Sequence, residues 1–97
     1  KPYIPQGYIS SWAQYSLLAT SESHRNKIMR LLKNSQVPSM IYYKNPLHLQ
    51  RVFDNLNYAK GDFPISEKIS KQIFSIPMHP YLTQSQQDKI IRLINNE

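Results

Sequence analysis

The sequence predicts an α+β fold, in which a small antiparallel or mixed sheet is covered by three or four helices. Residues 10–19 alternate apolar and polar side chains, the period of two expected of a half-buried strand. Three later segments instead repeat apolar residues every three or four positions, as amphipathic helices do. A chain of 97 residues can enclose one modest hydrophobic core, so we expect residues 1–97 to form a single domain.

The first strand is expected over residues 12–18, where Tyr15 and Leu17 face the side opposite to Gln14. Trp12 and Gln14 either form the wall of a cleft or belong to the packing of the sheet, with the amide in solvent. The pattern therefore predicts one strand with a single buried face.

The first helix is expected over residues 22–33. Residues 20–23 supply hydroxyl groups and an early carboxylate, which satisfy the free backbone N–H groups at a helix start. The basic residues of this segment, among them Arg25, suit a solvated face, and His24 is expected at the surface. The apolar face contains Ile28, Leu31 and Leu32.

A second strand is predicted over residues 40–43, because this run is rich in β-forming residues and lies between Pro38 and Asn45. The turn that follows carries His48. Apolar spacing then indicates a short helical segment over residues 47–56.

Two more helices are expected, over residues 65–74 and 84–94. Pro64 suits the first turn of the former, where its missing N–H is not needed, and Asp62 can cap it. Prolines restrict residues 75–80 to an edge strand or an extended crossing. The last helix starts with a capping box formed by Thr83 and Gln86, and its buried stripe contains Ile90, Ile91 and Ile94.

Composition argues against several functions. The net charge of +6 comes from basic residues spread along the chain, which argues against nucleic-acid binding. The sequence has no cysteine, and its few acids and histidines show no metal-binding spacing, so no metal site is predicted. It also lacks a signal-peptide pattern and an apolar run of about 18 residues, which predicts a cytoplasmic protein without a membrane partner.

Four motifs occur in a fixed order along residues 12–83, which make up most of the chain. They are Trp12-Ala13-Gln14-Tyr15, then Tyr42-Tyr43 with Pro46-Leu47-His48-Leu49-Gln50, then Pro64-Ile65-Ser66-Glu67, and finally Ile76-Pro77-Met78-His79-Pro80. This series resembles the C-terminal end of the DegT/DnrJ/EryC1/StrS family of pyridoxal-phosphate-dependent sugar aminotransferases. The resemblance implies the C-terminal small domain of a fold-type I aminotransferase, and a start at Lys1 favours an excised domain.

The resemblance implies transfer of an amino group, usually from glutamate, to a keto sugar attached to a nucleotide, with pyridoxal phosphate as electron sink. In the family, the cofactor-binding lysine and the phosphate-binding groups lie in the preceding large domain, and none of the lysines here has that context. We therefore expect no catalytic residue and no bound cofactor in these 97 residues, which should be inactive alone. The full-length enzyme is expected to be a homodimer.

The resemblance also implies that Tyr42, Tyr43 and His48 bind the substrate. Tyr42 stands where many members have histidine, while Tyr43 and His48 match common family residues and Lys44 replaces a frequent proline. Tyrosine and histidine can both donate a hydrogen bond to a sugar or phosphate oxygen, so the role can persist while sugar selectivity changes. The alternative is a well-packed turn whose tyrosine hydroxyls bond to the backbone.

Two further expectations concern the surroundings of this turn. Leu47 and Leu49 are expected to anchor it in the core. The spacing of Glu67 and Lys71 indicates a surface ion pair, whereas the Pro-x-x-Glu motif implies a conformational role for Glu67.

Other functions remain open from the sequence. One is a regulatory or ligand- or protein-binding module, since members of this family have been labelled pleiotropic regulators. Another, less favoured by the charge distribution, is a basic nucleic-acid-binding domain.

Overall fold

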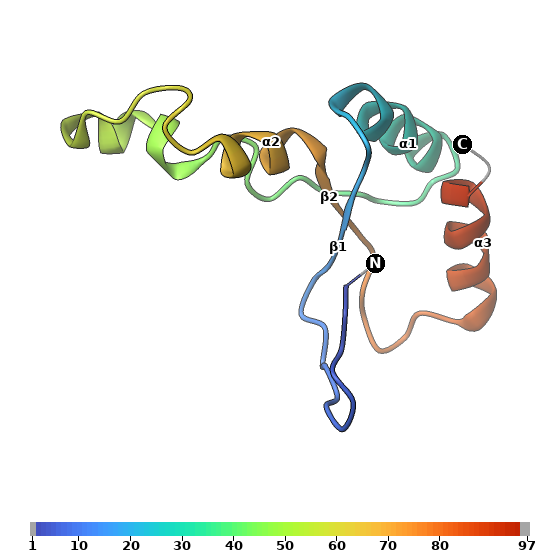
Figure 1. The fold of residues 1–97 in the computed structure, drawn as a ribbon. Coiled ribbons are helices and arrows are strands. Elements are labelled where there is room, and N and C mark those ends of the chain that lie inside the picture. The colour runs from blue at the N-terminus through green and yellow to red at the C-terminus, as the bar shows by residue number, and fades with distance from the viewer. Residues whose placement is uncertain (1, 96–97) are drawn as a thin grey trace.

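The computed structural model describes residues 2–95 (Figure 1). It confirms the α+β fold: a two-stranded antiparallel sheet is accompanied by three α-helices and two short 3-10 helices. No helix within the described residues is both long and apolar enough to cross a membrane. The elements, in order, are β1 (Tyr15–Leu18), α1 (Glu22–Asn34), η1 (Leu47–Leu49), η2 (Arg51–Leu56), α2 (Pro64–Gln72), β2 (Ile73–Ile76) and α3 (Gln84–Asn95).

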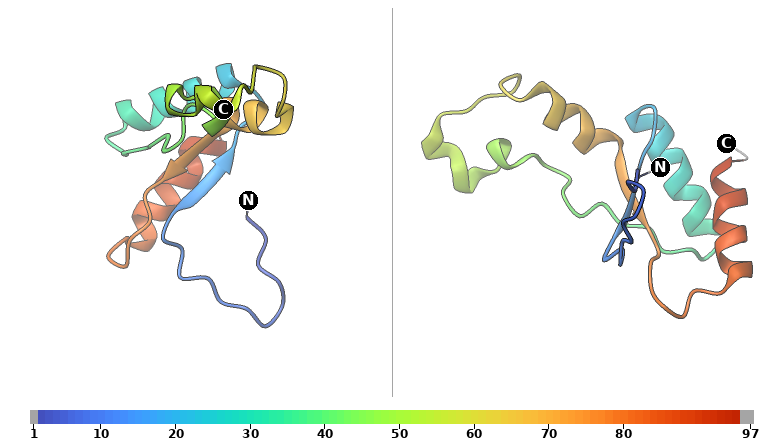
Figure 2. Two further views of the ribbon diagram at one scale, coloured as in Figure 1. Left: turned by 90° about the vertical axis from the view of Figure 1, so that its left-hand side faces the viewer. Right: turned by 60° about the horizontal axis from the view of Figure 1, so that its bottom comes forward.

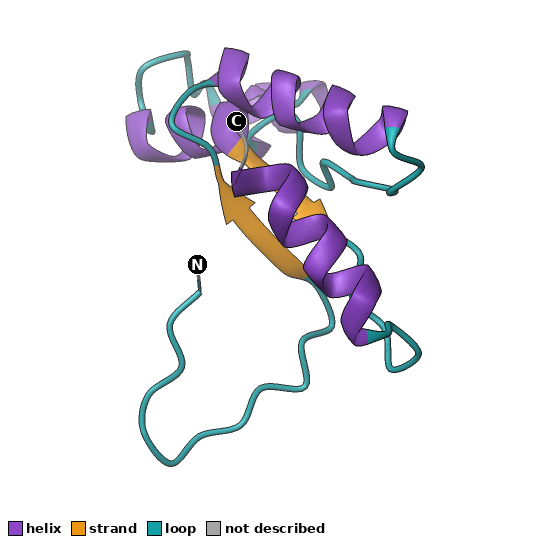
Figure 3. Cartoon of the chain, turned by 90° about the vertical axis from the view of Figure 1, so that its right-hand side faces the viewer, coloured by secondary structure: helices purple, strands orange, loops and turns teal. Residues whose placement is uncertain are grey.

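The hydrophobic core lies where α1 and α3 pack against the sheet (Figure 3). The strands pair from Tyr15 opposite Ile76 to Leu18 opposite Ile73. The core is small, because only six hydrophobic residues are buried among residues 2–95, and the largest of these are Phe74 and Leu32. The full set is Ala19, Ile28, Leu32, Val37, Phe74 and Ile90.

The predicted strand over residues 40–43 is wrong. Only Met40 pairs, through an isolated bridge in which Met40 and Ser75 exchange backbone hydrogen bonds of 3.0 and 2.7 Å. The partner of β1 is instead β2, whose first two residues were predicted to end a helix. Pairing with β1 overrides that helical spacing, since β-branched and aromatic residues such as Ile73 and Phe74 also suit a strand.

The first strand is also shorter than predicted, because β1 begins at Tyr15. Trp12 has a φ of 47°, in the left-handed region, so the chain bends there and cannot continue as a strand. Its ring packs on Tyr15, with 4.9 Å between ring centroids. Trp12 therefore caps the end of the sheet.

Most of the helix-start signals act as predicted. Ser21 accepts a hydrogen bond from the backbone N–H of His24 at 3.1 Å. Thr83 and Gln86 bond reciprocally, at 2.9 and 3.3 Å, which confirms the capping box. Asp62 is the exception: it accepts from the N–H of Ala59 and so caps the preceding turn, not α2.

Arg25 contradicts the prediction of a solvated basic face, because only 4% of it is exposed. Its guanidinium donates to the carbonyl of Ser70 at 3.0 Å and to Glu22 at 3.3 Å, which ties α1 to the end of α2. The helical period explains the burial, since Arg25 precedes Ile28 and Leu32 by three and seven residues and shares their face.

Residues 45–63, called here the protruding segment, extend away from the sheet beyond α2 (Figures 1 and 2). Neither of its 3-10 helices contains a buried residue. Leu47 and Leu49 are 61% and 39% exposed, so the prediction that they anchor the turn in the core is wrong. The segment is held by contacts at its base.

Candidate functional site

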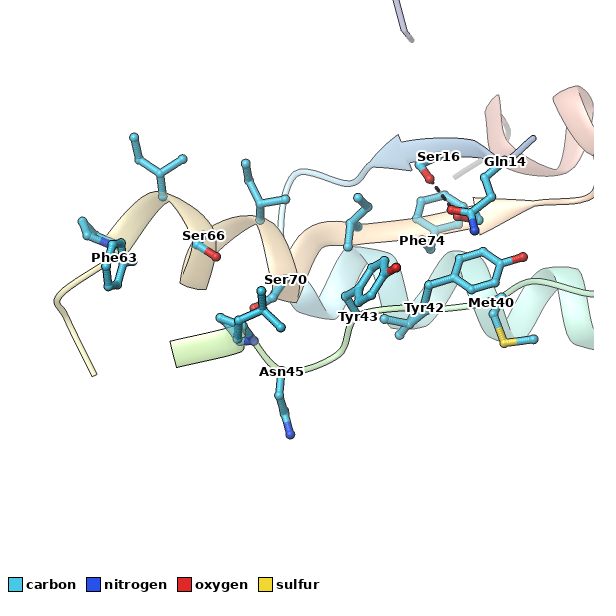
Figure 4. Close-up of a pocket in the computed structure, with 18 of the residues that line it drawn as sticks. Gln14, Ser16, Met40, Tyr42, Tyr43, Asn45, Phe63, Ser66, Ser70 and Phe74 are labelled. Carbon is cyan, nitrogen blue, oxygen red and sulfur yellow. Dashed lines mark hydrogen bonds between the residues drawn. The ribbon is translucent and has the colours of Figure 1, made fainter. Parts of the chain in front are cut away.

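An open groove of about 1010 Å³ lies between residues 40–47, the sheet and α2 (Figure 4). Its lining is mostly apolar and includes the exposed face of α2 that carries Ile65 and Ile69. The hydroxyls of Ser16 and Ser75, 2.8 Å apart, add a polar patch on the sheet side. The groove thus combines an apolar surface with a few polar groups, as small-molecule sites commonly do.

Tyr42 and Tyr43 both line this groove, side by side (Figure 4). They are 51% and 72% exposed. Within residues 2–95 no protein group is hydrogen-bonded to either hydroxyl, so both are available to a ligand. The structure therefore brings together two of the three site residues expected from the sequence.

His48 does not line that groove. It faces an adjoining cavity of about 350 Å³, which shares Leu47, Phe63 and Ser66 with the larger groove. The side chain of His48 is only 7% exposed, and its ring packs against Phe63 with 4.8 Å between centroids. The third expected site residue is thus separated from the tyrosines by a shared wall.

Glu67 is the residue whose importance the local spacing missed. Its Oε1 accepts a hydrogen bond from Nε2 of His48 at 3.0 Å and from the N–H of Gly61 at 2.7 Å. Its side chain is 13% exposed, so the surface position indicated by pairing with Lys71 is wrong. The conformational role implied by the Pro-x-x-Glu motif agrees with these contacts.

The electrostatics of this cluster favour an ionised carboxylate. The bond from the Gly61 amide, and after it the bond from His48, holds the pKa of Glu67 below its ordinary value of 4.5. No group of three histidine, aspartate or glutamate side chains that could hold a metal ion occurs within residues 2–95. The cluster is therefore a hydrogen-bonded carboxylate and imidazole pair.

Acid is expected to weaken the fold around Glu67. Because its folded pKa is lowered, the ionised carboxylate stabilises the folded protein above the ordinary value near 4.5, and this contribution is lost as the pH falls through the folded pKa. The stability advantage of wild type over Glu67→Gln should therefore shrink from neutral to acid pH. Urea denaturation across that range measures it, and two parallel stability curves would contradict the expectation.

The chain thus combines an α+β fold with a groove whose lining is largely apolar. The chain belongs to the DegT/DnrJ/EryC1/StrS aminotransferase family, whose model matches residues 4–95. This confirms the family indicated by the four motifs.

Relatives and solved structures agree with this assignment. The chain is 38% identical over 81 residues to a "Pleiotropic regulatory protein" of Geobacillus stearothermophilus, and the aligned residues cover 84% of this chain and 21% of the relative. It is 33% identical, with the same coverage, to the UDP-2-acetamido-2-deoxy-3-oxo-D-glucuronate aminotransferase of Pseudomonas aeruginosa. The crystal structure of a DegT DnrJ EryC1 StrS aminotransferase from Brucella abortus matches with a TM-score of 0.84 and 42% identity, over 98% of this chain and 25% of that one. The chain thus spans about a fifth of the length of these curated relatives.

Proposed function

We propose that these residues are the C-terminal small domain of a pyridoxal-phosphate-dependent aminotransferase that acts on a nucleotide-linked keto sugar. The family match supports this, together with a relative named for amino transfer to a UDP-linked sugar. The observation that carries the proposal is the pair of unbonded tyrosines, Tyr42 and Tyr43, on an open groove. The domain would contribute contacts to the sugar nucleotide and be inactive alone.

Pyridoxal phosphate supplies an electron sink in such enzymes. No lysine lines either the groove of Tyr42 and Tyr43 or the cavity of His48, so neither of these two sites fits that cofactor. Gly7 and Gly61 are isolated and do not form a phosphate-cradling turn. We therefore assign the cofactor and the catalytic groups to the larger part of a full-length enzyme, which we propose to be a homodimer that also takes an amino donor.

Each proposed site residue has a distinct role. The hydroxyls of Tyr42 and Tyr43 would donate hydrogen bonds to sugar or phosphate oxygens, while the apolar lining of the groove excludes water from the face of the ligand. His48 has only one free ring nitrogen, because Nε2 is bonded to Glu67. Its contact would be made from the smaller cavity, which His48 lines.

Replacing Tyr43 with phenylalanine in the full-length enzyme tests the proposal. We expect the KM for the nucleotide sugar to rise about 2- to 12-fold, or up to about 150-fold if the partner is a charged phosphate, while the KM for the amino donor stays constant. Tyr81→Phe is the matched control, because Tyr81 is 86% exposed and does not line the groove. Equal changes for both substrates, or none, would remove Tyr43 from the substrate site.

A regulatory or binding module is a second candidate. It is favoured by the name of the relative from Geobacillus stearothermophilus. Assay of the full-length protein separates the two functions: amino transfer to a sugar nucleotide supports the enzyme, and its absence in a protein that retains the cofactor-binding lysine supports the module.

A further inference from the structure

The base of the protruding segment is closed by one carboxylate. Oε1 of Glu67 accepts from Nε2 of His48 and from the N–H of Gly61, at 3.0 and 2.7 Å. His48 lies near the start of the segment and Gly61 near its end, so the two bonds join residues 48–61 into a closed loop on α2. A single side chain thereby fixes both ends of this loop.

Little else holds the loop in place. Apart from the side chain of His48, η1 and η2 bury little, and Val52 and Leu56 are 73% and 53% exposed. The other contacts at the base are the local turn bonds between Ala59 and Asp62 and an aromatic stack, in which the His48 ring packs on Phe63 and Tyr58 meets Phe63 edge-on at 5.0 Å. Because so little apolar surface is buried, the position of the loop depends on the carboxylate and this stack.

The same bond sets the protonation pattern of the imidazole. An ionised carboxylate can only accept, so the hydrogen of a neutral His48 ring must lie on Nε2, and Nδ1 must then be an acceptor. Within residues 2–95 no partner bonds to Nδ1, and no buried side-chain nitrogen or oxygen lacks a partner. Nδ1 therefore lies on the part of the ring that solvent reaches.

We propose that Glu67 is a positioning residue that closes the loop of residues 48–61 and fixes His48 with Nδ1 presented as a hydrogen-bond acceptor. One consequence rests on the proposed function: when His48 is neutral, the sugar-nucleotide group that meets its Nδ1 must be a donor, such as a hydroxyl or an amide N–H. A neutral His48 held in this way cannot donate to a phosphate oxygen. His48 would thus favour a ligand that places a hydroxyl or an amide N–H beside its Nδ1.

The tautomer is tested without any activity assay, in the full-length protein. Nitrogen NMR of isotopically labelled histidine, at a pH where the ring is neutral, should show a protonated Nε2 and an unprotonated Nδ1 for His48. The signals of His48 are identified because they are missing from the spectrum of His48→Gln. Glu67→Ala should populate both tautomers and increase hydrogen exchange at the Gly61 amide. Glu67→Gln should restore the wild-type pattern, because its amide oxygen accepts from the same donors.

Asp54→Ala is the matched control, since it removes an exposed acid from the same loop. It should leave the tautomer unchanged. A protonated Nδ1 in the wild-type protein would overturn the proposal without any variant, and so would a tautomer that Glu67→Ala leaves unaltered.

Kinetics separate this proposal from the function on which part of it rests. In His48→Gln, the amide N–H of glutamine lies near the former Nε2 and can still donate to Glu67. We expect His48→Gln to keep the Gly61 amide protected yet raise the KM for the nucleotide sugar about 2- to 12-fold. An unchanged KM with the tautomer confirmed would remove His48 from the substrate site and leave Glu67 as the residue that fixes the loop.

Discussion

Replacing Phe74 with alanine is expected to lower the free energy of unfolding by about 3–5 kcal/mol. Phe74 is 2% exposed and lies in β2 opposite Leu17, in a core that contains only six buried hydrophobic residues within the described part of the chain. With so few other residues to close around it, the cavity left by the ring should remain largely open, which places the loss toward the upper end. Urea denaturation followed by far-ultraviolet circular dichroism measures the change.

The matched control is Tyr81→Ala, which removes an aromatic ring that is 86% exposed. It should change stability by no more than about 0.5 kcal/mol. Equal losses for the two variants would mean that Phe74 is not the centre of the core.

The isolated 97-residue chain is expected to retain no pyridoxal phosphate through gel filtration and to turn over no amino sugar. The loss of activity relative to a full-length enzyme should be complete, because no lysine lines the groove or the His48 cavity. Visible absorbance of the purified chain after incubation with the cofactor measures its retention. Stoichiometric covalent attachment at one lysine, surviving gel filtration, would contradict both this expectation and the assignment of the cofactor to the rest of the enzyme.

Sequence patterns correctly predicted the features that depend on contacts between residues close together in the chain, such as the helix caps. Ser21, Thr83 and Gln86 act as helix caps because their partners lie within three residues in the chain. The same reasoning failed for the second strand, since a β-forming run does not specify which segment it pairs with. Residues 40–43 were rich in β-formers, yet the place beside β1 is taken by β2.

Arg25 and Leu47 show the opposite kinds of error. The charge of Arg25 predicted a solvent-exposed side chain, but its position one turn before Ile28 places it on the buried face of α1. There its guanidinium donates a hydrogen bond to a backbone carbonyl of α2. The apolar side chain of Leu47 was expected to be buried in the core, but the protruding segment extends beyond the core and leaves this side chain exposed. Residue type alone decided neither case, because burial depends on where the whole element packs.

The sequence by itself determined the α+β class, the starts of α1 and α3, and the family, all of which follow from local periodicity, capping and ordered motifs. Only the tertiary structure decided that Tyr42 and Tyr43 share a groove while His48 faces another cavity and bonds to Glu67. The reason is separation along the chain. His48 and Glu67 are 19 residues apart, and Ser16 and Ser75 are 59 apart, so each contact exists only after distant segments have packed together.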